Sequence, residues 1–279
     1  MTKNVLPMTT DEKIKILLEK KRYDFDDLVM LLEVLRSERG CPWDREQTHQ
    51  SIRKDLIEET YEVIEAIDTD NPILLREELG DLLLQIVFHA GIEAEKECFT
   101  VHDVANDICV KLIHRHPHVF GEVQADTSEK VLANWEVIKS EEKERITVTD
   151  KLKAIPPMLP ALMRAEKVGK KAKCFDFAGA EEAMDKVCEE LTEFSEVMQE
   201  KDVDRMEEEM GDLLLTLTSL CRKTGIEPER ALYRATEKFI GRFEKLEKMV
   251  LAEGKSMDDL TMAELDAIWE QNKKNDAIG

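Results

Sequence analysis

Apolar residues recur along most of this chain at intervals of three and four positions, which is the spacing of an amphipathic helix. One such stripe is formed by Met206, Met210, Leu213, Leu217 and Leu220. No stretch alternates between apolar and polar residues as a half-buried strand does. The pattern therefore predicts an all-α fold made of helical bundles.

Capping residues and prolines indicate where the helices begin. Thr9 with Glu12 and Thr261 with Glu264 have the spacing of a capping box, and Asn71 precedes a proline at the first helical position. We expect helices over about residues 9–22, 25–39, 48–67, 72–97, 101–115, 128–145, 162–171, 180–200, 203–224, 228–252 and 262–273.

A proline-rich segment separates two halves of similar helix content. Residues 147–160 contain Pro156, Pro157 and Pro160, so we interpret this segment as a linker. The predicted organisation is an N-terminal helical extension (1–24), a first helical domain (25–146), the linker (147–160) and a second helical domain (161–279).

The two halves repeat the same pair of acidic motifs. The motif E-E-x-x-E ends at Glu62 and again at Glu193, and the motif E-E-x-G-D ends at Asp81 and again at Asp212. Both pairs of motifs are separated by 131 residues. An acidic chain produces either motif easily by chance, but it does not easily produce both motifs twice at one offset.

The spacing of these acids predicts a metal site. Glu190 and Glu193 are three residues apart and share a helix face, as do Glu209 and Asp212. A short connection at residues 201–202 makes the two helices antiparallel neighbours, so the four carboxylates gather at the edge of the core. Such a group needs a cation to stay ionised, and oxygen donors select Mg²⁺, with Mn²⁺ as a substitute. The corresponding set in the first half is Glu59, Glu62, Glu78 and Asp81.

Gly80 and Gly211 lie inside the predicted helices that carry the second motif. A glycine there costs roughly 1 kcal/mol relative to alanine. We expect that another backbone or a ligand approaches the helix closely at these positions.

The charge and cysteine content limit the classes of partner. The chain has 61 acidic and 40 basic residues, a net charge of −21, which disfavours nucleic acid and anionic membranes as partners. A nucleotide would require metal ions and locally placed lysine or arginine. The six cysteines form no C-x-x-C pair, and no signal peptide or membrane-spanning run is present, so we expect a cytoplasmic protein without structural zinc or disulfides.

At these motifs the sequence resembles the MazG family of nucleoside triphosphate pyrophosphohydrolases, whose signature is E-E-x-x-E followed by E-x-x-D. The segments 41–44 (CPWD) and 115–120 (RHPHVF) are also similar to the first half of tandem MazG proteins. The resemblance covers roughly residues 25–274. It implies an all-α fold that dimerises, Mg²⁺ bound by the carboxylates, and hydrolysis of nucleoside triphosphates to monophosphate and pyrophosphate in nucleotide-pool housecleaning.

The resemblance also assigns roles to residues of the second half. The catalytic, metal-binding group is Glu190, Glu193, Glu209 and Asp212, in which Glu193 is the candidate water-orienting base, although the sequence does not separate it from Glu190. The substrate contacts fall on Lys186, Arg205, Lys238, Arg242, Trp269 and Lys273. Taken as residues alone, Lys238 with Arg242 is an i,i+4 cationic pair suited to a polyphosphate, and Trp269 offers a stacking surface.

The phosphate-side residues differ between the halves. At the offset of 131, Asp55 replaces Lys186 and Leu74 replaces Arg205. The first half keeps Lys111 and Arg115, and Trp135 and Lys139, at i,i+4 spacing. We expect the second half to carry most of the activity.

Two alternatives remain open at the level of sequence. A di-iron carboxylate bundle needs Glu-x-x-His on two helices, and here Glu46 with His49 has that spacing once, outside the quartet helices. A non-catalytic acidic helical scaffold explains the helices and the charge but not the repeated acids. The alternating histidines at 114, 116 and 118 are also consistent with a metal cluster. We favour a packed loop, because the second half has no histidines at the corresponding positions.

Overall fold

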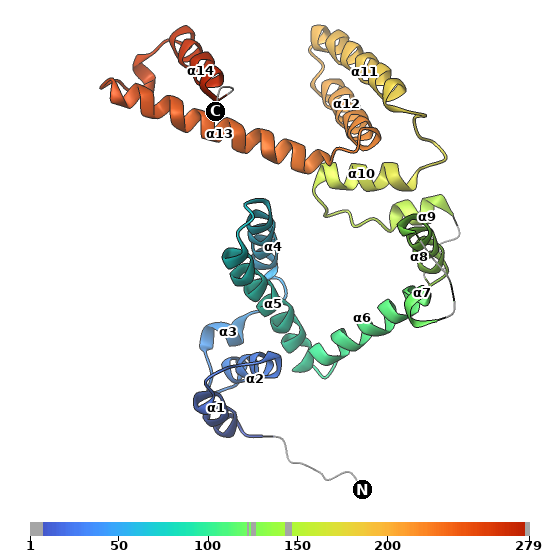
Figure 1. The fold of residues 1–279 in the computed structure, drawn as a ribbon, viewed down its shortest axis with the longest axis vertical. Helices are drawn as coiled ribbons and strands as arrows, with labels where there is room; N and C mark the ends of the chain where they lie inside the picture. Colours follow the sequence, from blue (N-terminus) through green and yellow to red (C-terminus); the bar gives the residue numbers. More distant parts are fainter. Residues whose placement is uncertain (1–7, 122, 124–126, 143–146, 277–279) are drawn as a thin grey trace. The chain divides into compact units, whose positions relative to one another are not determined.

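The computed structural model describes residues 8–121, 123, 127–142 and 147–276 and contains helices but no strand in those ranges. The predicted all-α fold is therefore confirmed. The chain divides into two compact units, Met1–Lys139 and Ser140–Gly279, which are described separately below. Figure 1 shows the order of the helices along the chain.

The described residues of the first unit form eight helices, the last of which extends three residues past Lys139. They are α1 (Thr10–Glu19), α2 (Phe25–Arg36), α3 (Pro42–Glu46), α4 (Arg53–Asp68), α5 (Pro72–Ala94), α6 (Val101–Arg115), α7 (Pro117–Phe120) and α8 (Ser128–Glu142). Its core lies where α2 and the start of α6 pack against the second half of α5. The buried apolar residues there are Leu32, Ile52, Val87, Phe88, Ala90, Ile92 and Val101.

The second unit is built around two long helices followed by a third. Its elements are α9 (Val148–Lys153), α10 (Ala161–Lys171), α11 (Ala180–Glu200), α12 (Val203–Lys223), α13 (Pro228–Ala252), the 3-10 helix η1 (Met257–Asp259) and α14 (Met262–Asp276). Helix α12 packs against α11, α10 and α13, and α14 packs against α13. None of the described helices combines the length and the hydropathy that crossing a membrane requires.

The repeat seen in the acidic motifs extends to the backbone of two helical hairpins, α4–α5 and α11–α12. In the turns, Asp70 and Lys201 both adopt left-handed backbone conformations, with φ of 50° and 59°. The next residues, Asn71 and Asp202, then cap the following helix by accepting hydrogen bonds from backbone N–H groups. Each pair of residues differs in number by 131. The same turn therefore fixes the register of the acids in both hairpins.

Several helices differ in their ends from the sequence prediction. Helix α1 stops at Glu19 and α2 at Arg36, because Lys20 and Ser37 are extended. Helix α4 begins only at Arg53, since residues 49–52 form turns. The short elements α3, α7, α9 and η1 were not predicted, and α9 lies within the segment assigned to the linker. The capping boxes predicted at Thr9 and Thr261 are confirmed.

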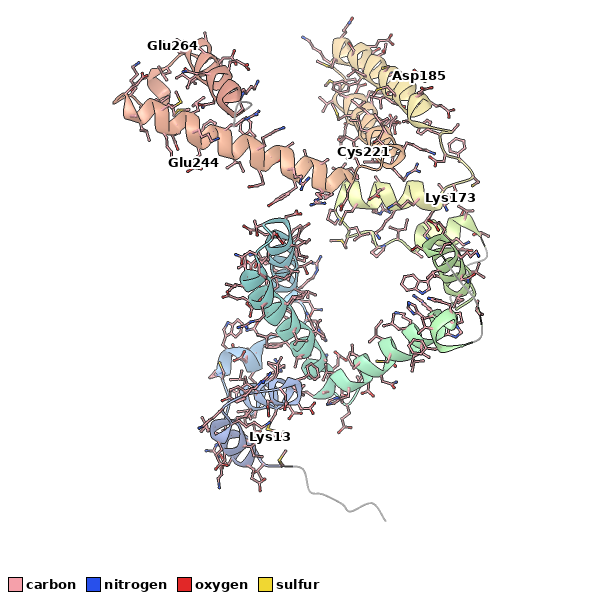
Figure 2. All side chains as sticks on the ribbon, in the orientation of Figure 1. Lys13, Lys173, Asp185, Cys221, Glu244 and Glu264 are labelled. Carbon is pink, nitrogen blue, oxygen red and sulfur yellow. The ribbon has the colours of Figure 1, made fainter. Side chains whose placement is uncertain are left out.

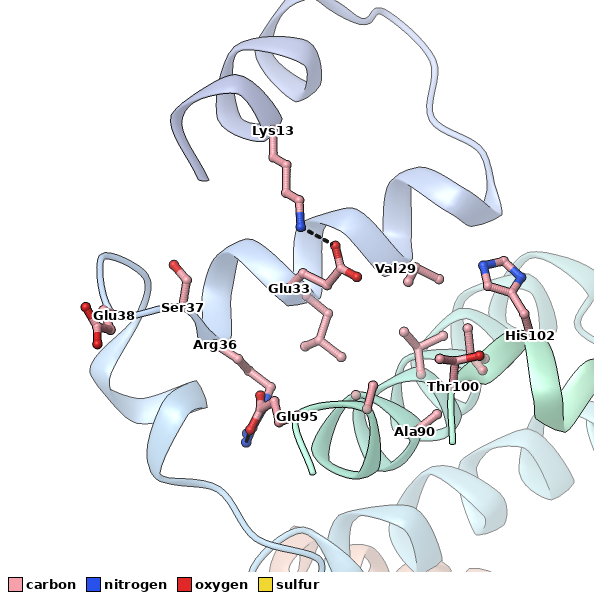
Figure 3. A pocket seen from close by; sticks show the side chains of 15 residues that line it. Lys13, Val29, Glu33, Arg36, Ser37, Glu38, Ala90, Glu95, Thr100 and His102 are labelled. Carbon is pink, nitrogen blue, oxygen red and sulfur yellow. Dashed lines mark hydrogen bonds and ion pairs between the residues drawn. The ribbon is translucent and has the colours of Figure 1, made fainter. Parts of the chain in front are cut away.

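A cavity of about 550 Å³ in the first unit lies between α1, α2, α5 and the start of α6 (Figure 3). Four of its charged side chains are paired: Lys13 contacts Glu33 at 2.7 Å, and the Arg36 guanidinium contacts Glu95 at 2.6 and 2.9 Å. None of the repeated acids lines it. The cavity is therefore separate from the predicted metal site.

A buried ion cluster holds the connection between α10 and α11 against the end of α12. Arg222 and Lys223 each donate to the Asp176 carboxylate at 2.9 Å, and the Asp176 side chain is 13% exposed. Hydrogen bonds from Arg222, reinforced by Lys223, lower the pKa of Asp176 to about 2. Because the folded pKa lies below the unfolded value, this carboxylate stabilises the fold above about pH 4, and the stabilisation is lost as the pH falls toward 2.

Asp176→Asn is therefore expected to lower the free energy of unfolding at pH 7 by about 1–3 kcal/mol, because two cations lose a charged partner. Urea denaturation at pH 7 and pH 3 measures the effect, and the difference from the native protein should shrink at pH 3. The control is Asp185→Asn, at an exposed position on α11 (Figure 2). Equal losses in the two variants would contradict a specific role for the cluster.

Candidate active site

The second unit brings acids of both predicted motifs together. One carboxylate oxygen each from Glu190 and Glu193 on α11 and from Glu209 on α12 lies within 4.8 Å of the other two. Glu190 is 5% exposed, so this group is partly withdrawn from water. Asp212, the fourth predicted member, is exposed and lies one helical turn beyond Glu209, outside the tight group.

The first unit forms a corresponding group at the same place on its hairpin. Here Glu59 on α4 and Glu78 and Asp81 on α5 approach within 4.8 Å. Glu62, the remaining predicted member, is close enough to raise the pKa of Glu59 and of Glu78. Three members of each predicted quartet thus meet closely in the described residues, but they are not the same three.

The electrostatics of both groups favour binding of a cation. Burial, followed by the nearby carboxylates, raises the pKa of Glu59 and of Glu78. Burial also raises the pKa of Glu193, with Glu190 and Glu209 adding to the effect and Lys186 opposing it. Each group therefore contains mutual repulsion between partly desolvated carboxylates, which Lys186 partly relieves in the second unit. An all-oxygen donor set of this kind fits a hard divalent ion such as Mg²⁺.

Lys186 is the predicted substrate contact that the structure places at the acids. Its ammonium group lies 2.7 Å from Glu189 and 2.9 Å from Glu190, one turn further along α11. These two carboxylates raise the pKa of Lys186. In the free chain the lysine is therefore a partner of a candidate metal ligand.

The other predicted substrate residues lie away from this contact. Arg205, at the start of α12, pairs with Glu200 across the turn. Lys238 and Arg242 lie on α13, and Trp269 and Lys273 lie on α14, which packs against α13. Trp269 contacts Phe239 with ring centroids 5.1 Å apart, and Lys273 pairs with Glu270. Helix α11, by contrast, packs against α12.

No backbone of the described chain makes the expected close approach at the two helix glycines, and approach by a ligand stays a prediction. A methyl group built on Gly80 or on Gly211 would meet no atom within 4 Å. Any group that approaches these positions must therefore come from another molecule.

Four of the six histidines form two packed clusters. His116 donates a 2.6 Å hydrogen bond from Nδ1–H to the Leu112 carbonyl oxygen of α6, and its ring contacts His118 and Trp135. His49 hydrogen bonds to His89 at 2.7 Å and to Glu93 at 2.6 Å. Sequence reasoning missed this second cluster, although the i,i+4 spacing of His89 and Glu93 on α5 was its available signal. Neither cluster belongs to the metal-binding groups found among the described residues.

The fold and the site together define the class of this protein: it is all-α and carries one acidic, candidate metal-binding group on each of two helical hairpins. The model of the MazG nucleotide pyrophosphohydrolase domain matches residues 47–120 and 179–246, which contain both acidic groups. The chain belongs to the MazG family. Trp269 and Lys273 lie beyond the second match.

Relatives extend the match over most of the chain. The nucleoside triphosphate pyrophosphohydrolase/pyrophosphatase MazG of Thermotoga maritima is 43% identical over 254 residues, which cover 90% of this chain and 96% of the relative. The nucleoside triphosphate pyrophosphohydrolase of Escherichia coli K12 is 42% identical, covering 90% and 97%. The uncharacterized protein YabN of Bacillus subtilis is 38% identical over 282 residues, which cover 99% of this chain and 56% of the relative.

Proposed function

We propose that this protein hydrolyses nucleoside triphosphates to the monophosphate and pyrophosphate in a Mg²⁺-dependent reaction, and that it removes unwanted nucleotides from the cytoplasmic pool. The observation that carries the proposal is the acidic group of Glu190, Glu193 and Glu209 inside a domain match that covers it. The names of the relatives from Thermotoga maritima and Escherichia coli support the reaction class.

The proposed roles follow from the chemistry of the side chains. Glu190, Glu193, Glu209 and Asp212 would bind the metal in the second unit, and Glu59, Glu62, Glu78 and Asp81 would do so in the first. When bound, Mg²⁺ supplies charge neutralisation for the phosphates and lowers the pKa of an attacking water.

The remaining groups act on the substrate and on water. Glu193 orients the attacking water and accepts its proton. We assign the phosphate contacts to Lys186, Arg205, Lys238 and Arg242. Each charge-assisted contact would stabilise the negative charge of the departing pyrophosphate. Trp269 stacks on the base, and Lys273 lies one turn away on α14.

The product assay tests the reaction directly. With Mg²⁺ and ATP, or another triphosphate from a panel, we expect pyrophosphate and monophosphate in equal amounts, and no turnover in the presence of a chelator. Mn²⁺ should restore activity after chelation. Orthophosphate with diphosphate as the first products would contradict cleavage between the α and β phosphates, and a lack of metal dependence would favour the scaffold alternative.

We also propose that two copies associate through their hairpins. Large apolar side chains remain exposed on both of them, among them Tyr61, Leu79, Leu83, Leu191, Met198 and Leu214. Two hairpins packed face to face form a four-helix bundle, which buries such side chains. The open positions at Gly80 and Gly211 leave room for a neighbouring helix.

Sedimentation equilibrium at micromolar concentration tests this association. The native chain is expected to show twice the mass of one chain, and Leu191→Glu should shift it toward the monomer by placing a charge in the interface. Leu251→Glu is the control, because this leucine is similarly exposed but lies at the end of α13. A fully active native monomer would contradict the proposal.

A further inference from the structure

The acidic groups of the two units differ in the cation that reaches them. In the second unit, the Lys186 ammonium group contacts Glu190 at 2.9 Å and Glu189 at 2.7 Å. The Glu190 side chain is 7% exposed, whereas the Glu189 side chain is 59% exposed. A divalent ion that binds through Glu190 must therefore compete with a lysine that already neutralises this buried carboxylate.

In the described part of the first unit, no such lysine pairs with the acidic group. The position that corresponds to Lys186 is Asp55. The neighbouring Lys54 pairs instead with Glu58 at 2.6 Å, where both side chains are at least half exposed. Glu58 is not a member of the close group. Among the described residues, no lysine or arginine forms an ion pair with Glu59, Glu78 or Asp81.

Helix geometry explains why Lys54 does not substitute for the missing cation. Adjacent residues on an α-helix point about 100° apart, whereas residues four apart share a face. Lys186 is four residues before Glu190, which lies in the close group, while Lys54 is four residues before Glu58, which does not. A shift of one position therefore moves the lysine from the metal ligand to a solvent-exposed neighbour.

We propose that Lys186 is a built-in counter-cation of the second acidic group, so that free divalent ions bind first to the group of Glu59, Glu78 and Asp81. The second group takes its metal together with the triphosphate. The phosphate oxygens then accept the hydrogen bonds of Lys186 and leave Glu190 available to the ion. This inference rests on the proposed function for the identity of the metal and of the nucleotide. It implies that the acidic group of the first unit holds a divalent ion whether or not nucleotide is bound.

The physical reason for this order is the balance of charge. Without nucleotide, a metal at the second group must separate Lys186 from Glu190 and leave the ammonium beside a divalent cation. A polyphosphate removes both penalties because it brings negative charge and acceptor oxygens with the ion. Within the described residues, no paired cation has to be displaced from the first group, and Asp55 adds a further negative charge to the helix that carries Glu59.

Binding of Mn²⁺ to the full chain tests the order of occupancy without measuring activity. Electron paramagnetic resonance counts free Mn²⁺ during a titration at about 0.15 M salt, where screening weakens adventitious binding to exposed acids. We expect one tight site per chain in the absence of nucleotide. Addition of a non-hydrolysable triphosphate analogue should reveal a second site.

Substitutions assign each site. Glu59→Gln is expected to abolish the tight site and Glu190→Gln to leave it unchanged, and Asp81→Asn provides a second first-unit variant at an exposed position. Lys186→Met should tighten the second site without nucleotide by at least about tenfold, the effect of one charge-assisted contact. Lys54→Met is the matched control and should change neither site. Circular dichroism verifies the helix content of every variant.

Two equal sites in the native chain without nucleotide, or a tight site abolished by Glu190→Gln, would overturn the inference, as would an unchanged affinity in Lys186→Met. The same measurements separate it from the proposed function. Turnover with two equal sites would leave the function standing and reject the order of occupancy. One tight site, lost in Glu59→Gln, without turnover of any triphosphate would support the resident site and reject the proposed reaction.

Discussion

Glu193→Gln and Asp212→Asn are each expected to reduce turnover by at least about 100-fold while the protein remains folded. Glu193 belongs to the close acidic group of the second unit, and Asp212 follows Glu209 by one helical turn. Each substitution removes one negative charge and keeps the shape of the side chain. The loss should therefore fall on metal binding and on the chemistry rather than on packing.

Thermal unfolding without metal separates this outcome from a structural role. Burial and the carboxylates of Glu190 and Glu209 already raise the pKa of Glu193, so its charged form is disfavoured in the free protein. Removal of the charge should leave the melting temperature unchanged or raise it. Glu196→Gln, at an exposed position of the same helix, is the control for turnover. A lowered melting temperature in both site variants would indicate that these acids support the fold.

The sequence predicted the fold class and the long helices well because their signals are local. The α4–α5 and α11–α12 hairpins follow from apolar periodicity, from capping by Asn71 and Asp202, and from the repeated acids. The short helices α3 and α7 were not predicted, because about one turn of helix contains too few residues to show a periodic pattern. Helix α1 ends early because the backbone at Lys20 is extended, and the spacing of apolar residues does not indicate this conformation.

The sequence predicted those parts of the candidate site that lie on a single helix or a single hairpin. The i,i+3 spacing on α11 and the turn at Lys201 bring Glu190, Glu193 and Glu209 together. The predicted contacts on α13 and α14 depend on packing between hairpins, and in the described chain these helices pack against each other. Likewise, the i,i+4 spacing of Lys186 and Glu190 allows their ion pair, but this spacing does not show which phosphate the lysine would meet.

The two units are expected to contribute unequally to turnover, with Glu190→Ala removing most of it and Glu59→Ala leaving most of it. Both acidic groups are present, so the carboxylates alone do not separate the units. The cations do: Asp55 stands at the position of Lys186, and Leu74 at the position of Arg205. The first unit thus lacks two charges that would meet a polyanionic substrate.

The expected size of this inequality follows from those two missing contacts. Each lost charge-assisted contact costs on the order of 1.5–3 kcal/mol, which corresponds to roughly 10- to 150-fold in rate or affinity. The carboxylate of Asp55 adds repulsion, and Lys54 offers little compensation because it pairs with Glu58. Steady-state release of pyrophosphate from the two alanine variants, compared at equal protein concentration and saturating Mg²⁺, gives the ranking. If Glu59→Ala is the more damaged enzyme, the main site lies in the first unit, and Lys186 and Arg205 are not the residues that decide competence.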